Sequence, residues 1–124
     1  MKRREAREAI LQLLFQKDFM GQIDPSDLPT EPYVCEVLEG VSEHQDEIDR
    51  LIAERSEAWK LERLYSVDRN LLRMAIYELL FREDVPPEVI INEAVELAKS
   101  YGTEKSPSFI NGVLDRVLKE RVRR

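Results

Sequence analysis

Basic residues gather at both ends of an otherwise acidic chain, and they are the first residues whose chemistry stands out. The net charge is −6. Residues 2–7 (KRREAR) nevertheless hold four basic side chains and one acidic side chain, and residues 116–124 hold five basic and one acidic. Because lysine and arginine attract phosphate groups, this distribution favours nucleic acid held at the ends of an acidic body. The alternative is that the basic residues complement helix dipoles and that charged termini only aid solubility.

Gln12 and Phe15 follow the first basic cluster, toward the edge of a helix expected over residues 5–19. A flat ring and an amide near arginines can stack on an unpaired base and hydrogen-bond to it. An aromatic residue at helical spacing is more often part of the core, so the spacing by itself favours a core position for Phe15.

The residue types that catalysis or metal binding needs do not occur at a usable spacing. His44 is the only histidine and Cys35 the only cysteine, so neither a metal site nor a His-based triad nor a disulfide within the chain can be assembled. The sequence also has no Walker loop, no dinucleotide glycine fingerprint and no serine elbow. We therefore expect a protein that is not an enzyme and has no catalytic residue, metal site or cofactor.

No stretch of the sequence has the pattern of a membrane span or a secretion signal. The hydrophobic runs are too short to cross a bilayer, and none follows a basic segment as in a signal peptide. We expect a cytoplasmic protein that does not engage a membrane.

The longest apolar run lies within residues 66–81 (SVDRNLLRMAIYELLF) and predicts the helix around which the others pack. Its second half has almost no polar residues, and a helix that is apolar nearly all round must be wrapped by other helices. Ser66 is expected to cap its N-terminus, with Asp68 in the first turn facing the positive end of the dipole. The charged residues at its two ends are where a partner could touch it.

No segment alternates apolar and polar residues as a strand would, so the fold class is all-α. Three prolines within residues 21–32 predict a loop. Gly40 is expected to bend a long helix, and Gly102 to end one in a left-handed conformation. Gly112 suggests that another backbone packs close to the last helix. The expected helices are 5–19, 33–56, 66–81, 88–101 and the segment from Ser106, with Trp59 anchoring a short link over 57–65.

Four motifs in the second half of the chain resemble those of the NusB family of bacterial transcription antitermination factors. In order, they are LR-x-A-x-YEL, DVP, INEAVELAK-x-[FY]G and F-[IV]-NGVLD, and the opening RREAREAILQLLFQ resembles the arginine-rich first helix of that family. The resemblance covers about two-thirds of the chain, since residues 21–57 match only in helical pattern. It implies one compact domain over residues 1–124, with about six to seven helices in two small bundles around a central buried helix. Residues 1–8 would form a basic N-terminal arm leading into the first helix.

The resemblance also implies partners. Members of the family bind a single-stranded leader RNA element, boxA, together with the small-subunit ribosomal protein NusE, and join antitermination complexes on RNA polymerase that support ribosomal RNA synthesis. The family's ribosomal-protein surface would fall on Asp68, with Arg69 and Leu72 as its neighbours. Its RNA surface would fall on Lys2, Arg3, Arg4, Arg7, Gln12, Phe15, Tyr101, Lys105 and Phe109.

Two departures from the family pattern act in opposite directions. Glu5 interrupts the arginine run, which should weaken RNA binding, whereas Lys105 stands where the family often has an acid, which should strengthen it. Two other functions stay open: the RNA-binding part of a ribosomal RNA cytosine methyltransferase, which would need a further cofactor-binding domain, and a helical adaptor that binds no RNA. The family includes monomers and dimers, so a homodimer stays open as well.

Overall fold

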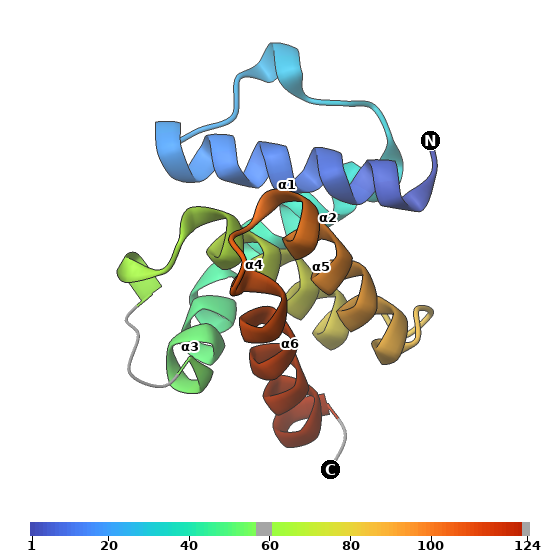
Figure 1. Ribbon diagram of the computed structural model, residues 1–124. Coiled ribbons are helices and arrows are strands. Elements are labelled where there is room, and N and C mark those ends of the chain that lie inside the picture. Colours follow the sequence, from blue (N-terminus) through green and yellow to red (C-terminus); the bar gives the residue numbers. More distant parts are fainter. Residues whose placement is uncertain (57–60, 123–124) are drawn as a thin grey trace.

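The computed structural model describes residues 1–56 and 61–122, and every regular element in that part of the chain is helical (Figure 1). Trp59, expected to anchor the link before the central helix, lies outside the described residues. Short 3₁₀ turns, η1 and η2, cover Pro25–Asp27 and Leu61–Arg63, and a π-helical segment, η3, covers Leu118–Val122. The α-helices are α1 (Arg3–Met20), α2 (Pro32–Glu43), α3 (Gln45–Arg55), α4 (Ser66–Phe81), α5 (Pro87–Tyr101) and α6 (Ser106–Val117).

Helix α4 occupies the centre of the molecule, as its sequence predicts. It contacts each of the other five α-helices, and 11 of its 16 residues are buried. Tyr65, not Ser66, is the N-cap residue, and no side chain caps the helix. The Ser66 hydroxyl instead donates a hydrogen bond to Asp18 Oδ2 on α1, at 3.2 Å, so the expected cap is wrong because another helix has engaged its hydroxyl.

The other helices form two groups that share α4. Helices α1 and α2 contact each other and α4, while α3, α5 and α6 pack on α4 and α6 contacts both α3 and α5. In Figure 1, α1 lies across one end of the second group, above the turn between α5 and α6, and α6 runs away from it. The predicted all-α fold with a central buried helix is therefore confirmed. The packing also places α1 beside the turn between α5 and α6, the two segments that carry the predicted RNA-binding residues (Figure 1).

The helix expected over residues 33–56 is two helices, α2 and α3, which meet at His44. Gly40 lies inside α2, and the break between the two helices comes four residues later, at His44. The Tyr77 ring packs so closely on Gly40 that a Cβ atom there would overlap it, so this glycine serves the contact between α2 and α4. His44 stacks on Phe81, with ring centroids 4.2 Å apart, and this contact gives the lone histidine a structural role.

Two other glycines also differ from their predicted roles. Gly102 follows α5 in an extended conformation (φ −94°, ψ −166°), and it is glycine because a side chain would collide with Ser106 and with the Ala98 carbonyl. The left-handed residue is Gly21, with φ +87°, which ends α1. Gly112 has only the tip of Arg116, at 4.0 Å, near its missing side chain, so the expected close backbone contact is wrong.

The described helices and side chains bear on two kinds of function, membrane insertion and metal binding. None of those helices is long and apolar enough to cross a membrane. Among the described residues, no group of three or more His, Cys, Asp and Glu side chains could hold a metal ion.

Candidate nucleic-acid interface

Helix α1 presents exposed cations and rings along one face. The helix begins at Arg3, so residues 3–8 are its first turns and not a separate arm. Its buried stripe passes through Ile10, Leu13 and Leu14, and Phe15 lies just beyond that stripe with 42% of its surface exposed. A core position for Phe15, which the spacing alone favours, is therefore wrong. Gln12 is exposed on the same helix.

Phe19 extends this aromatic face and was not predicted from the sequence. It is 78% exposed, and its ring lies parallel to that of Phe15, with centroids 6.4 Å apart and 4° between the planes. The signal was present, because residues four apart share one face of a helix. The pair of rings gives an exposed apolar strip on α1.

Arg7 does not belong to this exposed face. Its side chain is 4% exposed and forms two hydrogen bonds to the Glu78 carboxylate, at 3.1 and 3.2 Å. The Tyr33 hydroxyl donates a third hydrogen bond to Glu78, at 2.8 Å. Burial opposes the charged form of Arg7, but the contacts with Glu78 outweigh it and raise the pKa of Arg7. Arg7 therefore joins α1 to α2 and α4, and we remove it from the expected RNA contacts.

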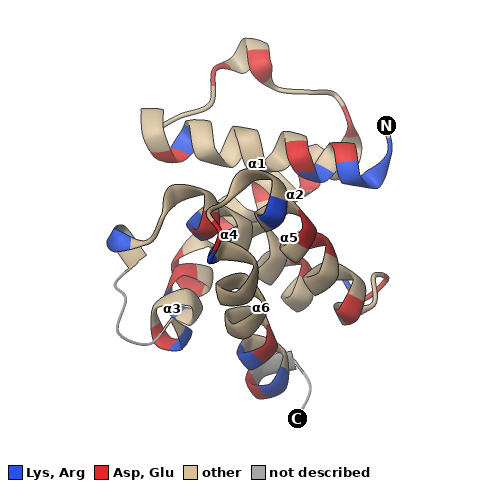
Figure 2. Ribbon diagram, in the orientation of Figure 1, with Lys and Arg blue, Asp and Glu red and all other residues tan. Residues whose placement is uncertain are grey.

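Arg3 and Arg4 remain at the surface, at the end of α1 where Figure 2 shows basic residues. Arg4 makes two contacts to the Glu93 carboxylate of α5, at 3.2 and 2.7 Å, while its side chain stays 54% exposed. Hydrogen bonding by Arg4 lowers the pKa of Glu93 despite partial burial of that carboxyl. The Arg3 guanidinium lies 3.9 Å from the centre of the Tyr33 ring. Lys2 is exposed just before the helix.

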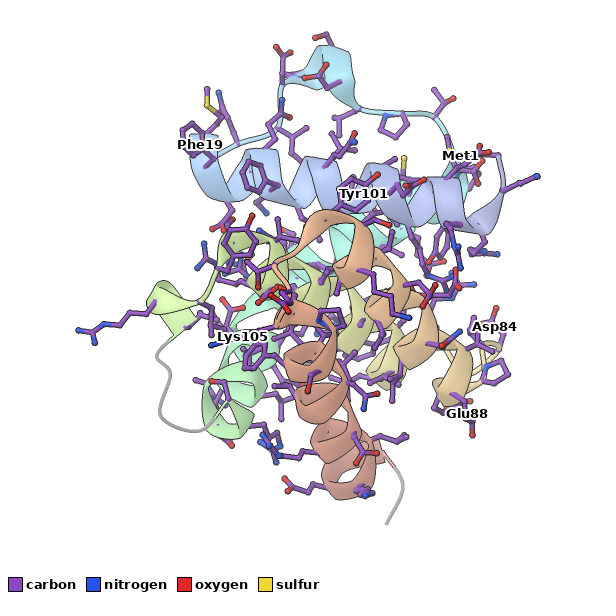
Figure 3. All side chains as sticks on the ribbon, viewed as in Figure 1. Met1, Phe19, Asp84, Glu88, Tyr101 and Lys105 are labelled. Carbon is purple, nitrogen blue, oxygen red and sulfur yellow. The ribbon has the colours of Figure 1, made fainter. Side chains whose placement is uncertain are left out.

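The turn between α5 and α6 lies against α1. The Tyr101 hydroxyl donates a hydrogen bond to Glu8 Oε2, at 2.6 Å, and that bond raises the pKa of Tyr101. Figure 3 shows Tyr101 beside α1 and Lys105 below it, at the start of α6. Lys105 is exposed and Phe109 is half-buried. Residues almost a hundred positions apart in sequence thus share one side of the molecule.

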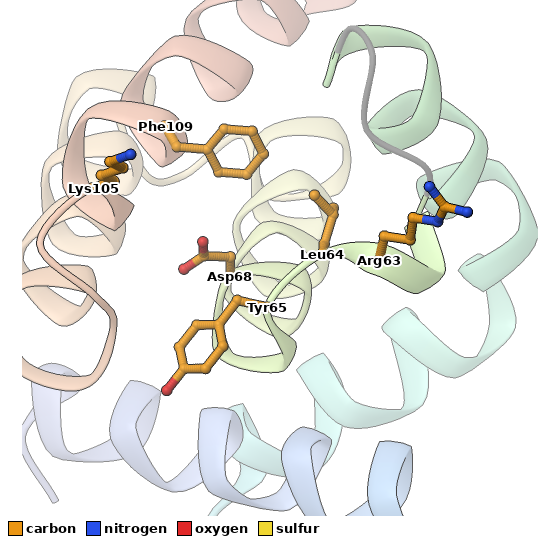
Figure 4. Close-up of a pocket in the computed structure, with 6 residues that line it drawn as sticks. All are labelled: Arg63, Leu64, Tyr65, Asp68, Lys105 and Phe109. Atoms are coloured by element: carbon orange, nitrogen blue, oxygen red, sulfur yellow. The ribbon is translucent and has the colours of Figure 1, made fainter.

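A cavity of about 290 Å³ opens between η2, the start of α4 and the start of α6 (Figure 4). Asp68 lies in its wall and is only 8% exposed. Its Oδ1 atom is buried and accepts no hydrogen bond from any described residue. Burial raises the pKa of Asp68, and a hydrogen bond with Ser106 only partly opposes that shift. The lining side chains are Arg63, Leu64, Tyr65, Asp68, Lys105 and Phe109.

The other two residues expected to bind a protein partner have structural roles. Leu72 is 0% exposed, so it is a core residue and the expectation for it is wrong. Arg69 donates two hydrogen bonds to Asp18 Oδ2, from Nε at 3.0 Å and from Nη2 at 2.5 Å. Its Nη1 atom donates to the carbonyls of Leu61 and Leu64, at 3.1 and 3.0 Å. It therefore fixes η2, which forms one wall of the cavity. Of the three expected residues, only Asp68 faces an open space.

The amino-acid sequence is similar to those of known proteins over nearly its whole length. The family model described as NusB family matches residues 4–119. The chain is 49% identical over 125 residues to the transcription antitermination protein NusB of Geobacillus kaustophilus (strain HTA426), with 94% of this chain and 95% of that protein covered. It is 43% identical over 130 residues to the protein of the same name from Bacillus subtilis (strain 168), with 94% and 95% covered.

Solved structures show the same fold. T. maritima NusB aligns with a TM-score of 0.89 and 43% identity, with 98% of this chain and 94% of that chain covered. A chain of the crystal structure of antitermination factors NusB and NusE in complex with dsRNA aligns with a TM-score of 0.81 and 28% identity, with 94% and 96% covered.

Proposed function

Because this chain belongs to the NusB family, we propose that it is a transcription antitermination factor. In this proposal it binds the single-stranded boxA element together with the ribosomal protein NusE. The pair then joins RNA polymerase and supports ribosomal RNA synthesis. Support comes from relatives that are named as antitermination proteins and match nearly the whole chain, and from a similar chain solved with NusE and RNA.

The observation that carries the proposal is the shared surface of α1 and the α5–α6 turn. It combines exposed cations with exposed rings on a chain whose net charge is −6. Cations pair with phosphates, and each base stacked on an aromatic ring contributes about 1–3 kcal/mol to binding. Unpaired nucleotides supply both groups, because their bases are free to stack. The proposed contacts are Lys2, Arg3, Arg4, Gln12, Phe15, Tyr101, Lys105 and Phe109, with Phe19 added.

Contacts within this surface can be exchanged for RNA. Arg4 is the exposed member of its pair with Glu93, with 54% of its side chain exposed against 17% for Glu93, and Tyr101 meets Glu8 at the surface. Exposed ion pairs contribute little to stability because water and salt screen them. Glu93 also has Arg7 Nη1 at 4.0 Å, so we expect that a phosphate can replace Glu93 beside Arg4 at little cost to the fold.

A titration of a labelled boxA strand, followed by fluorescence anisotropy, tests the RNA surface. We expect an Arg4→Ala, Phe15→Ala variant to bind more weakly than the unmodified protein, because it lacks one cation and one stacking platform. Lys119→Ala is the matched control, since Lys119 is exposed, pairs with Asp115 one turn away and lies just beyond the end of α6 that points away from α1. Equal affinity of the double variant and the control would contradict the proposed surface.

Co-purification with NusE, with and without boxA RNA, tests the partner. We expect the protein to retain NusE in both cases and to retain more when RNA is present, because RNA contacts both partners in this proposal. Retention that RNA does not change, together with no RNA binding by either protein, would favour an adaptor that binds no RNA.

A further inference from the structure

We propose that Glu8 selects the RNA base that binds at the middle of α1, by accepting a hydrogen bond from an exocyclic amino group at its free carboxylate oxygen, Oε1. The inference rests on the proposed RNA-binding function and deepens it, because it names a residue that chooses between bases. Glu8 is not among the RNA contacts that the family resemblance implies.

Glu8 lies within the exposed stripe of α1, the five side chains that the helical repeat of about 3.6 residues places on one face. In order along the helix, the stripe consists of Arg4, Glu8, Gln12, Phe15 and Phe19. A cation therefore lies at one end of the stripe and two rings lie at the other. The carboxylate and the amide between them are groups that hydrogen-bond to the edges of bases.

The Glu8 carboxylate has one oxygen in use and one that a ligand can reach. Oε2 accepts a hydrogen bond from the Tyr101 hydroxyl, at 2.6 Å, and Figure 3 shows Tyr101 beside α1. Oε1 accepts none from the described residues, and unlike Asp68 Oδ1 it is not closed off from solvent. Because Tyr101 holds the carboxylate in place, Glu8 presents a fixed acceptor that RNA can use without breaking the existing hydrogen bond.

The negative charge of Glu8 indicates that a base, and not a phosphate, binds beside it. A carboxylate repels phosphates, whereas the exposed cations Lys2, Arg3 and Arg4 attract them at the N-terminal end of the same helix. Tyr101 and Phe15 supply ring faces on either side of Glu8 in the proposed surface, and an unpaired base can stack on either ring. Such a base has its Watson–Crick edge free to hydrogen-bond to a side chain.

The carboxylate favours bases with an amino group over uracil. Cytosine carries an amino group that donates to Glu or Asp, and adenine carries one as well. Uracil presents a carbonyl oxygen where cytosine has its amino group, and that oxygen would face the negative charge of Glu8. Gln12 offers both a donor and an acceptor, so it can pair with either base. Glu8 should therefore set a preference for cytosine over uracil, two bases of nearly equal size.

Binding of two labelled homopolymers, r(C)₁₂ and r(U)₁₂, tests the inference by fluorescence anisotropy at one salt concentration. We expect the unmodified protein to bind r(C)₁₂ at least about threefold more tightly than r(U)₁₂. Glu8→Gln keeps an oxygen for the Tyr101 hydroxyl and replaces the other with an amino group that can donate to uracil, so the ratio should fall to about one.

Glu5→Gln is the matched control. Glu5 is exposed on the first turn of α1 and lies outside the stripe, so its removal takes away the same charge without changing the proposed acceptor. We expect this variant to bind both strands more tightly, because one repulsive charge near the phosphates is gone, and to keep the ratio of the unmodified protein.

The outcomes are distinct. Equal affinity of the unmodified protein for the two strands, with binding still weakened by Arg4→Ala and Phe15→Ala, would overturn the inference and leave the proposed function standing. An unchanged ratio in Glu8→Gln would show that another group makes the choice and would also overturn it, as would binding of boxA RNA with no binding of either homopolymer. If the unmodified protein binds neither homopolymer nor boxA RNA, the proposed function fails and the inference fails with it. Circular dichroism confirms in each case that the variant is folded.

Discussion

Arg4 and Arg7 lie one turn apart on α1 and make the same kind of contact, yet they differ in exposure. Arg4 holds the Glu93 carboxylate with a side chain that is 54% exposed, and Arg7 holds the Glu78 carboxylate with a side chain that is 4% exposed. Both use Nε and Nη2 to reach two carboxylate oxygens. The acids differ in burial, since the Glu78 side chain on the central helix is 1% exposed and the Glu93 side chain on α5 is 17% exposed. Arg7 Nη1 also lies 4.0 Å from Glu93 Oε1.

The burial of each arginine indicates whether its guanidinium is available to bind an RNA phosphate. Arg4 is 54% exposed, and Glu93 keeps Arg7 Nη1 at 4.0 Å when Arg4 leaves, so Arg4 can exchange Glu93 for a phosphate at little cost. Breaking a buried pair leaves a charge without compensation inside the protein, so Arg7 must stay with Glu78. Asp68 is a third case, a buried acid whose Oδ1 atom has no partner among the described residues. Substitutions at Arg7, Arg4 and Asp68 should therefore differ in their effects on stability and on RNA binding.

The largest effect is expected from Arg7→Ala. Removal of the guanidinium leaves the buried Glu78 carboxylate with the Tyr33 hydroxyl as its one donor among the described residues, so we expect a loss of about 3–5 kcal/mol in the free energy of unfolding. Urea denaturation measures it. Arg7→Met combined with Glu78→Gln removes both charges and should recover much of the loss. A cost for Arg7→Ala no greater than that for Arg4→Ala would refute the distinction between the two arginines.

A smaller effect is expected from Tyr33→Phe. The change keeps the ring under Arg3 and removes only the hydroxyl that donates to Glu78 at 2.8 Å. Because a buried carboxylate loses one of its hydrogen bonds, we expect a loss of about 1–3 kcal/mol, again by urea denaturation. Tyr101→Phe is the matched control, since its hydroxyl bonds to an acid at the surface, and it should cost much less.

Asp68→Asn is expected to stabilise the protein at neutral pH by about 1 kcal/mol, because it removes an incompletely paired charge from a buried position. Burial raises the pKa of Asp68 in the folded state, so the folded protein binds that proton more tightly than the unfolded chain. The gain is therefore present at pH 7 and disappears as the pH falls through the raised pKa toward the usual aspartate range. Thermal unfolding at several pH values measures it. A gain that does not change with pH would contradict this account.

Arg4→Ala is expected to have the smallest effect on stability and a clear effect on RNA. The free energy of unfolding, measured by urea denaturation, should change by no more than about 1 kcal/mol, because Arg4 is 54% exposed and Glu93, which is 17% exposed, keeps Arg7 Nη1 at 4.0 Å. The affinity for boxA RNA should fall a few-fold, and the slope of log affinity against log salt should decrease by about 0.7, as expected for one phosphate contact on a single strand. An unchanged slope would show that Arg4 meets no phosphate.

Most of the fold could be predicted from local patterns in the sequence. The apolar run over residues 66–81 corresponds to α4 at both ends, and the proline-rich segment 21–32 has only one short 3₁₀ turn before α2 begins at Pro32. The glycines were less predictable, because Gly40 and Gly102 are required by a ring and a side chain that reach them from other positions. A glycine in the sequence indicates an unusual backbone conformation or a close contact at that position, but it does not indicate which neighbouring residue requires it.

Local sequence patterns are enough to predict most of the helices, the family and the types of residue that can bind RNA, because helical periodicity and short motifs depend on residues close together in the chain. The tertiary structure decided which of those residues face solvent. It buried Arg7 and Leu72, exposed Phe15 and Phe19, and joined Asp68 to Lys105 and Phe109 around one cavity. Exposure and pairing depend on helices that pack from distant parts of the chain. Arg4 meets Glu93 of α5 at the edge of the surface, whereas Arg7 is buried between Glu78 of α4 and the same Glu93.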